Sequence, residues 1–513
     1  MQAATKVVFN TVVLYAKIIV SMTIALVSVP LVLKALGVSD YGLYNLVAGV
    51  VAMLSFLNNS MTVSSQRYMS VAMGSNDENR INLVYNTSFF LHLIMGCIIV
   101  IILECGTPFI GRLNIDSTRI ESAEIIYQFL VLSTFCKIIS VPFDAIINAH
   151  EDLLVFSIIE LLDSVLMLLL AVGLQYLPGD KLIIYGFGVA LIAFLNYFLK
   201  YGWTLFSYKK YRIHLKKYYK DLVSKEMFGF AGWNLFGGLA TIGRNQGVAV
   251  VINMFLGTIA NAAYGVANQI NGVLSHFTTT FQKAINPQLM KSEGMNNRER
   301  LIRISFVSSK YSVLALCFFA VPFIIEMDDI LSIWLKDNIP PFTQELSCYI
   351  LLLSIVHQFS AGIMSSIQAV GKIRDYQITM GLILLTNVPL SYVIIKAGYP
   401  IYYATAVFVV MEVISLIIRL YFAKNLVNMR PWDFIWLVFV PVLITIVPSV
   451  MLCIIPHLFI SFLWMRLIVT FAVFILMYIL FAWKFALDYS FKDLLKNKAK
   501  YVICSCCGRR NNK

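Results

Sequence analysis

The chain has 513 residues, of which 59% are hydrophobic and only 13% carry a charge. An apolar excess of this size excludes a soluble protein and predicts an all-α integral membrane protein. The formal net charge is +13, but the basic residues flank apolar runs. That distribution indicates membrane topology and contact with lipid headgroups, and it argues against a nucleic-acid partner.

Apolar windows of about 20 residues predict about fourteen transmembrane helices. The first run is too long for a signal-peptide core and lacks a small-residue cleavage site, so we expect it to be retained. In chain order the predicted spans lie near residues 8–34, 41–62, 85–105, 123–147, 153–177, 182–206, 227–255, 259–285, 304–325, 345–368, 376–396, 401–423, 433–455 and 461–487.

The distribution of basic residues predicts the orientation of these spans. With a cytoplasmic N-terminus, 25 of the 40 lysines and arginines fall on cytoplasmic segments and 6 on the opposite face. The positive-inside rule therefore predicts that both termini are cytoplasmic. We expect the basic stretch at 208–226 and the basic tail at 489–513 to contact anionic lipids.

Residues 36–80 are repeated, faintly and without gaps, at residues 256–300, with 8 identities in 45 positions. Six predicted spans separate equivalent positions, so both copies cross the membrane in the same direction, as a parallel repeat. This predicts an N-terminal six-helix lobe at 1–207, a basic cytoplasmic linker at 208–226 and a C-terminal six-helix lobe at 227–427. Two further helices at 428–488 and the tail lie outside the duplication. The identical pairs are Leu36/Leu256, Gly37/Gly257, Tyr44/Tyr264, Leu54/Leu274, Ser55/Ser275, Gly74/Gly294, Asn76/Asn296 and Arg80/Arg300.

The two copies have diverged unequally. The second has Ala260 where the first has Asp40, and its spans at 227–255 and 259–285 are richer in polar residues. We expect this asymmetry to mark where a substrate binds. We expect His276 and His357 to be interior histidines whose hydrogen bonds are satisfied within the protein. The predicted polar lining is Asn234, Asn245, Gln246, Gln269 and Gln282.

Charged side chains inside predicted spans need a reason, because each costs about 2.5–3.5 kcal/mol at mid-bilayer on insertion scales. Two interpretations stay open: internal ion pairs, or a water-filled cationic cavity for a phosphate-bearing substrate. Pairing suits the three cations of spans seven to nine less well, because those spans hold no acid before Glu326. The deep cations are Lys17, Lys137, Arg244, Lys283 and Lys310; the acids available for pairing or ion coupling are Asp144, Glu160, Asp163 and Glu412.

Four further cations lie near span ends, where a long side chain reaches the membrane surface. We therefore expect Lys200, Arg419, Arg466 and Lys484 to snorkel.

Nothing in the sequence indicates catalysis. It contains no glycine-rich phosphate loop followed by Lys-Ser or Lys-Thr, no metal-ligand spacing and no nucleophile triad. Cys504, Cys506 and Cys507 cluster in the tail without a fourth ligand nearby, so we expect reduced bystander cysteines. The sequence predicts a protein that is not an enzyme and uses no metal and no cofactor.

The corner between the first two spans carries a recognisable motif. Residues 30–49 read PLVLKALGVSDYGLYNLVAG, with Pro-Leu ending one span, then Leu-Gly, an acid, Tyr-Gly and a tyrosine entering the next. This segment resembles the polysaccharide flippases, of O-antigen or capsule type, in the multidrug/oligosaccharidyl-lipid/polysaccharide exporter superfamily. SQRYM at 65–69, the loop at Gly74 and Asn286-Pro287 resemble the same family, and the fourteen-span plan extends the likeness to the whole chain.

The resemblance implies a flippase of a bacterial cytoplasmic membrane. It would move a polyprenyl-diphosphate-linked oligosaccharide, an O-antigen, capsule or exopolysaccharide repeat unit, from the inner to the outer leaflet by alternating access. The five deep cations would hold the diphosphate in a central cavity. Its implied partners are the lipid-linked glycan, membrane lipids and other polysaccharide-assembly membrane proteins.

Three alternatives stay open. One is a carrier of lipid-linked peptidoglycan precursor or teichoic acid. A drug or cation antiporter of the same superfamily would need cavity acids, whereas the first span carries Lys17 and no acid. A membrane glycosyltransferase or polymerase would place its catalytic residues in a larger external loop than those near 107–123 and 327–344.

Overall fold

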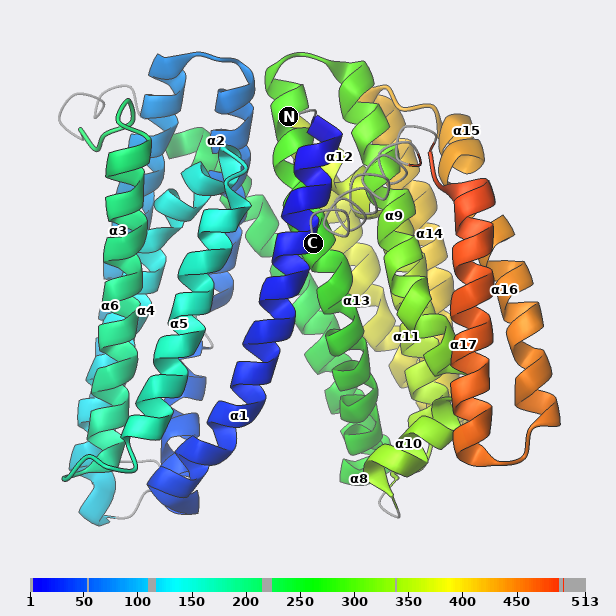
Figure 1. The fold of residues 1–513 in the computed structure, drawn as a ribbon, viewed down its shortest axis with the longest axis horizontal. Helices are drawn as coiled ribbons and strands as arrows, with labels where there is room; N and C mark the ends of the chain where they lie inside the picture. The colour runs from blue at the N-terminus through cyan, green and yellow to red at the C-terminus, as the bar shows by residue number, and fades with distance from the viewer. Residues whose placement is uncertain are drawn as a thin grey trace, which may run out of the picture. The chain divides into compact units, whose positions relative to one another are not determined.

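The computed structural model describes residues 3–52, 55–108, 117–214, 224–336, 339–488 and 492. Helices make up nearly all of this described part, which contains no strand, and the expected all-α class is confirmed (Figure 1). The tail cysteines Cys504, Cys506 and Cys507, and most of the tail at 489–513, lie outside the described residues.

The helices follow one another with short connections. The first half contains α1 (Ala3–Ala52), α2 (Ser55–Gly74), α3 (Glu78–Gly106), the short η2 (Ser117–Arg119), α4 (Ile120–Ala149), α5 (Leu153–Gly173) and α6 (Lys181–Ser207). The second contains α8 (Ser224–Gly294), α9 (Arg298–Ile325), α10 (Met327–Leu335), α11 (Thr343–Phe359), α12 (Ala361–Val370), α13 (Arg374–Lys396) and α14 (Ile401–Val427). Last come α15 (Pro431–Phe434), η4 (Ile435–Phe439), α16 (Val440–Phe459), α17 (Leu463–Phe481) and η5 (Ala482–Ala486).

Within the described residues, 11 helices are long and apolar enough to cross a membrane, or up to 12 if the bent pair α11–α12 is one span. This shows a multi-pass membrane protein, but the expected count of fourteen is not confirmed. The difference has two sources. The single candidate Lys225–Gly294 contains both spans predicted at 227–255 and 259–285. The span predicted at 41–62 is divided between α1 and α2, around residues 53–54, which the structure does not describe.

Each long helix is broken at a glycine of the sequence repeat. Gly37 in α1 has φ 79° and ψ 167°, and Gly257 in α8 has φ 76° and ψ −171°. Only glycine adopts this backbone without a steric penalty, because any Cβ would crowd the chain. The Leu-Gly corner of both copies is therefore a break between two helical segments.

The duplication extends well beyond the segment in which the sequence reveals it. Helices α2 and α8 end at the equivalent positions Gly74 and Gly294, and α3 and α9 begin at the equivalent positions Glu78 and Arg298. Helices α6 and α14 keep the same register at both ends. Asn76 and Asn296, which follow the paired helix ends, are both left-handed, with φ 54° and 55°. One register therefore relates the two copies as far as the end of α14.

The ends of α2 and α8 touch through a reciprocal pair of glycine contacts. A Cβ at Gly74 would lie 2.3 Å from the carbonyl oxygen of Lys291, and one at Gly294 would lie 2.0 Å from that of Val71. Val71 and Lys291 are themselves equivalent positions of the repeat. Each glycine therefore lets the other helix's backbone approach closely, as small residues do at membrane helix crossings.

Contacts divide the chain into two compact units. The N-terminal unit comprises Asn10–Leu239 and Pro287–Asn297; the C-terminal unit comprises Met1–Phe9, Ala240–Asn286 and Arg298–Lys513. The lobe boundaries drawn from the sequence, 1–207 and 227–427, stay a prediction.

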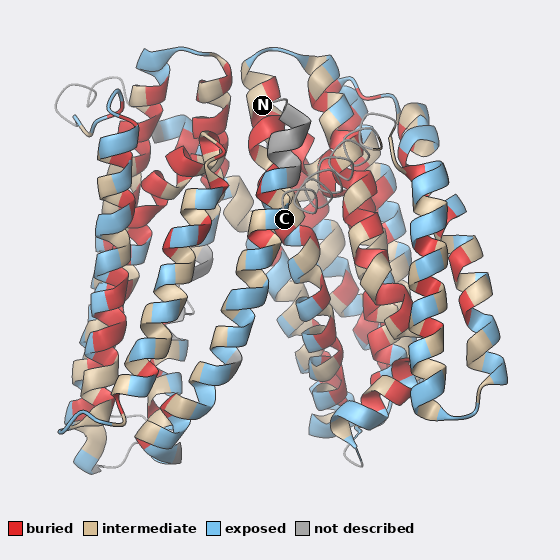
Figure 2. Ribbon diagram, viewed as in Figure 1, coloured by how far each residue is buried: buried red, intermediate tan, exposed pale blue. Residues whose placement is uncertain are grey.

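Helix α4 is central to the N-terminal unit. It packs against α2, α3, α5 and α6 and carries the broadest buried surface of the unit's helices (Figures 1 and 2). Phe143 of α4 is fully buried, with ring centroids 5.6 Å and 5.5 Å from Tyr197 and Tyr201 of α6. Aromatic edge packing of this kind adds to the apolar burial.

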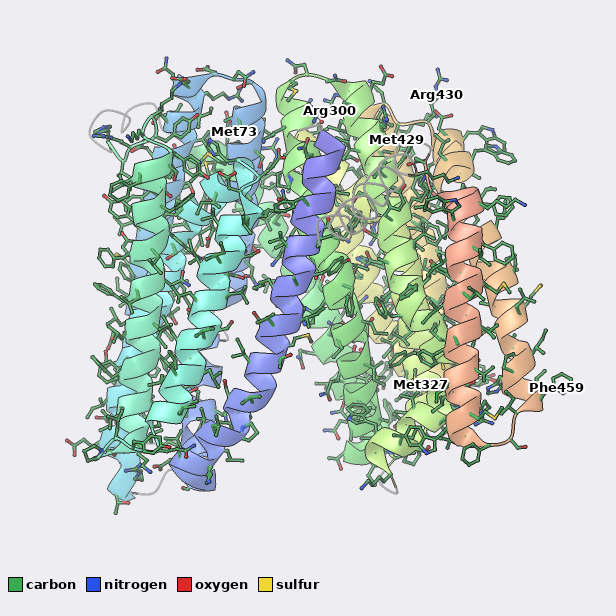
Figure 3. All side chains as sticks on the ribbon, in the orientation of Figure 1. Met73, Arg300, Met327, Met429, Arg430 and Phe459 are labelled. Atoms are coloured by element: carbon green, nitrogen blue, oxygen red, sulfur yellow. The ribbon has the colours of Figure 1, made fainter. Side chains whose placement is uncertain are left out.

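Helix α9 is central to the C-terminal unit. It packs against α11 and α12 and against the terminal hairpin α16–α17, where the Tyr478 hydroxyl donates to the Leu314 carbonyl at 2.8 Å. Figure 3 places Arg300 and Arg430 at one end of this unit's helices and Met327 and Phe459 at the other. The hairpin covers α9, which explains why α9 is more buried than α3, its counterpart in the first copy.

Candidate functional site

Two lysines inside the N-terminal unit, Lys17 and Lys200, are neutralised by carboxylates. Lys17 Nζ lies 2.5 Å from Glu160 Oε2, and Lys200 Nζ lies 2.8 Å from Asp144 Oδ1. Lys200 is buried, because α6 places it against α4. The expectation that Lys200 snorkels is therefore wrong: it pairs inside the helix bundle.

Lys137 differs from its neighbours in having no such partner. It is exposed on α4 and forms no ion pair with any residue that the structure describes. Asp163 of α5 is within electrostatic range of Lys137, but its carboxylate accepts a hydrogen bond from Asn196 at 3.3 Å. Lys137 is thus a cation without a bonded counter-ion.

In the C-terminal unit, Lys310 pairs with an acid that lies outside the predicted spans. Its Nζ lies 2.6 Å from Asp488 Oδ1, and the Tyr311 hydroxyl lies 3.3 Å from the other carboxylate oxygen. Asp488 directly follows the last predicted span. An acid from the end of the chain therefore neutralises a buried cation in α9.

Arg244 and Lys283 lie on α8, one on each side of the break at Gly257. Arg244 donates from Nε and Nη2 to Asn245 Oδ1 at 3.1 Å and 3.0 Å, and Lys283 is exposed. Neither forms an ion pair within the described chain. Of the five deep cations, three therefore lack a bonded carboxylate among the residues that the structure describes: Lys137, Arg244 and Lys283.

Glu412 is the centre of a buried charge cluster in α14. Its Oε1 accepts a hydrogen bond from His357 Nδ1 of α11 at 2.8 Å and pairs with Arg419, which also donates to Ser360 Oγ at 3.0 Å. Glu412 and Arg419 are both buried. The expectation that Arg419 snorkels is wrong, because Glu412, earlier in the same helix, neutralises it inside the protein.

The polar residues of α8 divide between packing and exposure. Gln282 donates to Gln358 of α11 at 2.9 Å, and the Asn234 amide donates to the Phe230 carbonyl at 3.0 Å. Asn245 accepts from Arg244, whereas Gln246, Gln269 and also His276 are exposed. Further contacts of α8 join Ser354 to Asn271 at 2.5 Å and Ser365 to Asn286 at 2.9 Å.

The acid of the first-corner motif belongs to a network that the sequence did not predict. Arg119 Nε donates to Asp40 Oδ1 at 2.9 Å, its Nη1 donates to Asp180 Oδ2 at 2.8 Å, and Ser122 Oγ donates to the same oxygen at 2.8 Å. Hydrogen bonds from Arg119 to Asp40 raise the pKa of that guanidinium. Burial alone would raise the pKa of Asp180, but its hydrogen bonds from Ser122, Arg119 and the Leu182 amide hold it below its usual value.

The whole network is absent from the second copy. The equivalent positions there are Ala260, Ile339, Phe342 and Pro400, none of which can form an ion pair. The replacement of Asp40 by Ala260 is thus one of four substitutions that remove the network from the second copy. The network fastens α1, α4 and α6 of the first copy only, which indicates a structural function for the motif acid.

Two groups of buried acids lie outside the candidate residues named from the sequence. Glu326 lies 3.2 Å from His457 Nδ1 and 3.5 Å from Arg466 Nε, and Arg466 also pairs with Asp329. Arg466 is therefore tied down by acids and does not snorkel as expected.

Glu151 forms the second of these groups. Its carboxylate lies 2.5 Å from Lys291 Nζ and accepts from Gln288 Nε2 at 2.5 Å, while Asn10 Nδ2 donates to its backbone carbonyl at 3.1 Å. A spacing of 140 along the sequence separates Glu151 from Lys291, so no local motif could have revealed the pair. Within the described chain, no group of three His, Cys, Asp or Glu is arranged to hold a metal ion.

Comparison with known proteins gives one family and one fold. A family model described as "Polysaccharide biosynthesis protein" matches residues 7–293. No curated protein matches the chain.

Solved structures that resemble the chain are transporters of the MATE type. A MATE in the bent conformation superposes with a TM-score of 0.71 at 15% identity, covering 83% of this chain and 96% of that one. An outward-facing multidrug resistance MATE family transporter of the MOP superfamily gives 0.70 at 14%, covering 83% and 96%. The Vibrio cholerae MATE transporter VcmN in the bent form gives 0.66 at 13%, covering 83% and 97%. At these identities the likeness shows a shared fold alone.

Proposed function

The chain belongs to the polysaccharide biosynthesis protein family, and from that premise we propose that it is a flippase for a polyprenyl-diphosphate-linked oligosaccharide. It moves an O-antigen, capsule or exopolysaccharide repeat unit from the inner to the outer leaflet of a bacterial cytoplasmic membrane. It is not an enzyme, and its partners are the lipid-linked glycan, membrane lipids and other polysaccharide-assembly proteins. Both termini are cytoplasmic, in keeping with the distribution of basic residues.

The main support for this proposal is that the deep charged side chains of α8 without an ion-pair partner among the described residues are positive. The deep acids Asp144, Glu160 and Glu412 all have bonded cations. In contrast, Arg244 and Lys283 on α8 have no carboxylate partner in the described chain. Unneutralised cations in an apolar setting are kept for a function, and guanidinium and ammonium groups are the usual ligands of phosphate oxygens.

This charge balance favours an anionic substrate over a cationic one. A drug or cation antiporter requires acids without a bonded cation. Of the four candidate acids, Asp163 alone has no bonded cation among the described residues, and it is hydrogen-bonded to Asn196 and lies in range of Lys137. A carrier of peptidoglycan precursor or teichoic acid shares the diphosphate and differs in the sugar.

The test is transport by the purified full chain in proteoliposomes, with a polyprenyl-diphosphate glycan as substrate. We expect Arg244→Gln and Lys283→Gln each to reduce the transport rate about 10-fold or more, since losing one charge-assisted hydrogen bond costs about 1.5–3 kcal/mol. Lys137→Gln is measured separately, because this residue belongs to the other unit. Lys424→Gln, which removes an exposed charge at the end of α14, is the matched control and should transport normally.

Each alternative predicts a different result. Transport of a peptidoglycan precursor in preference to the oligosaccharide supports the first alternative, and uptake of a cationic drug without glycan transport supports the antiporter. Normal glycan transport by the three neutralised variants contradicts the assignment of the diphosphate to these cations.

A further inference from the structure

The duplication places a basic side chain at one equivalent position of both copies. Lys137 of α4 and His357 of α11 correspond in the register that relates Gly37 to Gly257. The first copy carries an exposed lysine there, and the second carries a histidine whose side chain is 41% exposed. A permanent charge in one copy is thus a titratable charge in the other.

The surroundings of His357 fix which ring nitrogen is available. Nδ1 lies 2.8 Å from Glu412 Oε1, and an acidic partner on one ring nitrogen holds the proton there. Nε2 therefore faces away from Glu412, and it has no hydrogen bond to any described residue. The neutral ring presents a lone pair at Nε2, whereas the imidazolium presents an N–H donor.

The charged groups around the ring cancel one another, so the second proton of His357 sets the net charge of the cluster. Glu412 and Arg419, both on α14, cancel each other, and Tyr376 of α13 interacts with Arg419. With His357 neutral, this cluster has no net charge; with His357 protonated, it carries one positive charge. An anion is therefore attracted to Nε2 only when the ring holds its second proton.

Neighbouring side chains show that His357 lies in a polar stretch of the C-terminal unit. Ser354, one turn earlier, is bonded to Asn271 of α8, and Gln358 accepts from Gln282 of the same helix. Gln282 is followed in sequence by Lys283, which has no ion pair in the described chain. These hydrogen-bonded amide and hydroxyl groups make the stretch around His357 polar, which suits a hydrated anion.

We propose that His357, held by Glu412 and Arg419, is an anion-binding site for a phosphate-type group that binds together with a proton. The proposal rests on the proposed function only in its choice of a diphosphate as ligand. It assigns a proton to the binding of that diphosphate, so binding is tighter at the lower of two pH values.

The test uses inorganic pyrophosphate, titrated calorimetrically into the purified full chain at pH 5.5 and pH 7.5. Since the second proton on His357 supplies both the N–H donor and the positive charge, we expect about 10-fold tighter binding at pH 5.5. His357→Gln should bind weakly at both pH values. His357→Lys, which restores the residue type of the first copy, should bind tightly at both, and it also reports the effect of pyrophosphate's own protonation.

Wild-type binding that is absent, or that shows the same pH dependence as His357→Lys, would overturn the proposal. So would a His357→Gln variant that keeps the wild-type pH dependence. Unfolding of each variant is followed by intrinsic fluorescence, and both substitutions leave the buried Glu412–Arg419 pair in place. The glycan transport assay is run at a single pH, so it decides the proposed function independently of this result.

Discussion

Asp180 shows how one carboxylate can fasten three helices of the first copy. It accepts hydrogen bonds from Arg119, Ser122 and the Leu182 amide, and these hold its pKa below the usual value. The ionised form therefore stabilises the folded chain at every pH above the unfolded-state pKa of about 3.9. That contribution is lost as the pH falls through the lower, folded-state pKa.

We expect Asp180→Asn to lower the free energy of unfolding by about 1–3 kcal/mol at pH 7, since it leaves Arg119 with one acid and removes a charged acceptor. The melting temperatures of the variant and the wild-type chain in detergent should differ by a constant amount from pH 8 to about pH 5 and converge below about pH 4. A gap that widens on acidification would contradict the assignment. Ser122→Ala serves as the control, with a smaller loss of the same sign.

Single residues also show where sequence reasoning reaches its limit. Lys17 and Lys310 were visible as deep cations, but their partners Glu160 and Asp488 lie 143 and 178 residues away. Their pairing follows from helix packing, which no local pattern encodes. Position along a span alone predicts that Lys200 and Arg419 reach the membrane surface. Both lie instead on a helix face that is buried inside the protein.

At the scale of elements, the crossing of α2 and α8 depends on having no side chain at two positions. We expect Gly74→Ala to destabilise the full chain by about 1–3 kcal/mol, as other overpacked contacts do, because the new Cβ would meet backbone 2.3 Å away. Gly294→Ala should have a similar effect, for the reciprocal reason. Thermal unfolding in detergent, followed by intrinsic fluorescence, measures both.

Gly202→Ala is the matched control for these variants. Gly202 is helical, in α6, and a Cβ there would meet no atom within 4 Å. We expect it to be neutral or to stabilise by up to about 1 kcal/mol through helix propensity. Equal melting temperatures for the Gly74 and Gly202 variants would show that the crossing can relax without cost.

At the scale of the whole molecule, the terminal hairpin α16–α17 completes the surroundings of α9. It supplies Arg466 to Glu326 and Asp329, and the segment after it supplies Asp488 to the buried Lys310. A chain ended after Val427 leaves these groups uncompensated, and breaking a buried pair by removing one partner costs about 3–5 kcal/mol. We expect this truncation to yield little monodisperse protein in size-exclusion chromatography.

Supplying residues 428–513 as a separate chain is the control for that truncation. Because the lost contacts are non-covalent, co-expression should restore part of the folded yield. A truncated chain that is as abundant and monodisperse as the full chain would contradict a stabilising function for the hairpin.

Much of the architecture was available from composition and spacing. Apolar run length predicted the helices, and 8 identities predicted a duplication that helix boundaries now extend to Val427. The count of fourteen spans is not confirmed, because two of the predicted spans are joined through Gly257 without a polar loop and form one long candidate helix. The sequence identifies the candidate cations. Which of them lack a bonded carboxylate depends on how the helices pack, and that is known only from the structure.

The glycine contact between α2 and α8 also bears on the origin of the chain. Gly74 of the first copy meets the backbone at Lys291 of the second, and Gly294 of the second copy meets the backbone at Val71 of the first. Since Gly74 and Gly294 are equivalent positions, as are Val71 and Lys291, the two contacts are the same contact made in both directions. An isologous contact of this kind is what two identical subunits make across a two-fold axis. An ancestor with a single copy of the repeat could have formed it only by dimerising. The symmetry of the contact is therefore what a duplicated repeat is expected to give.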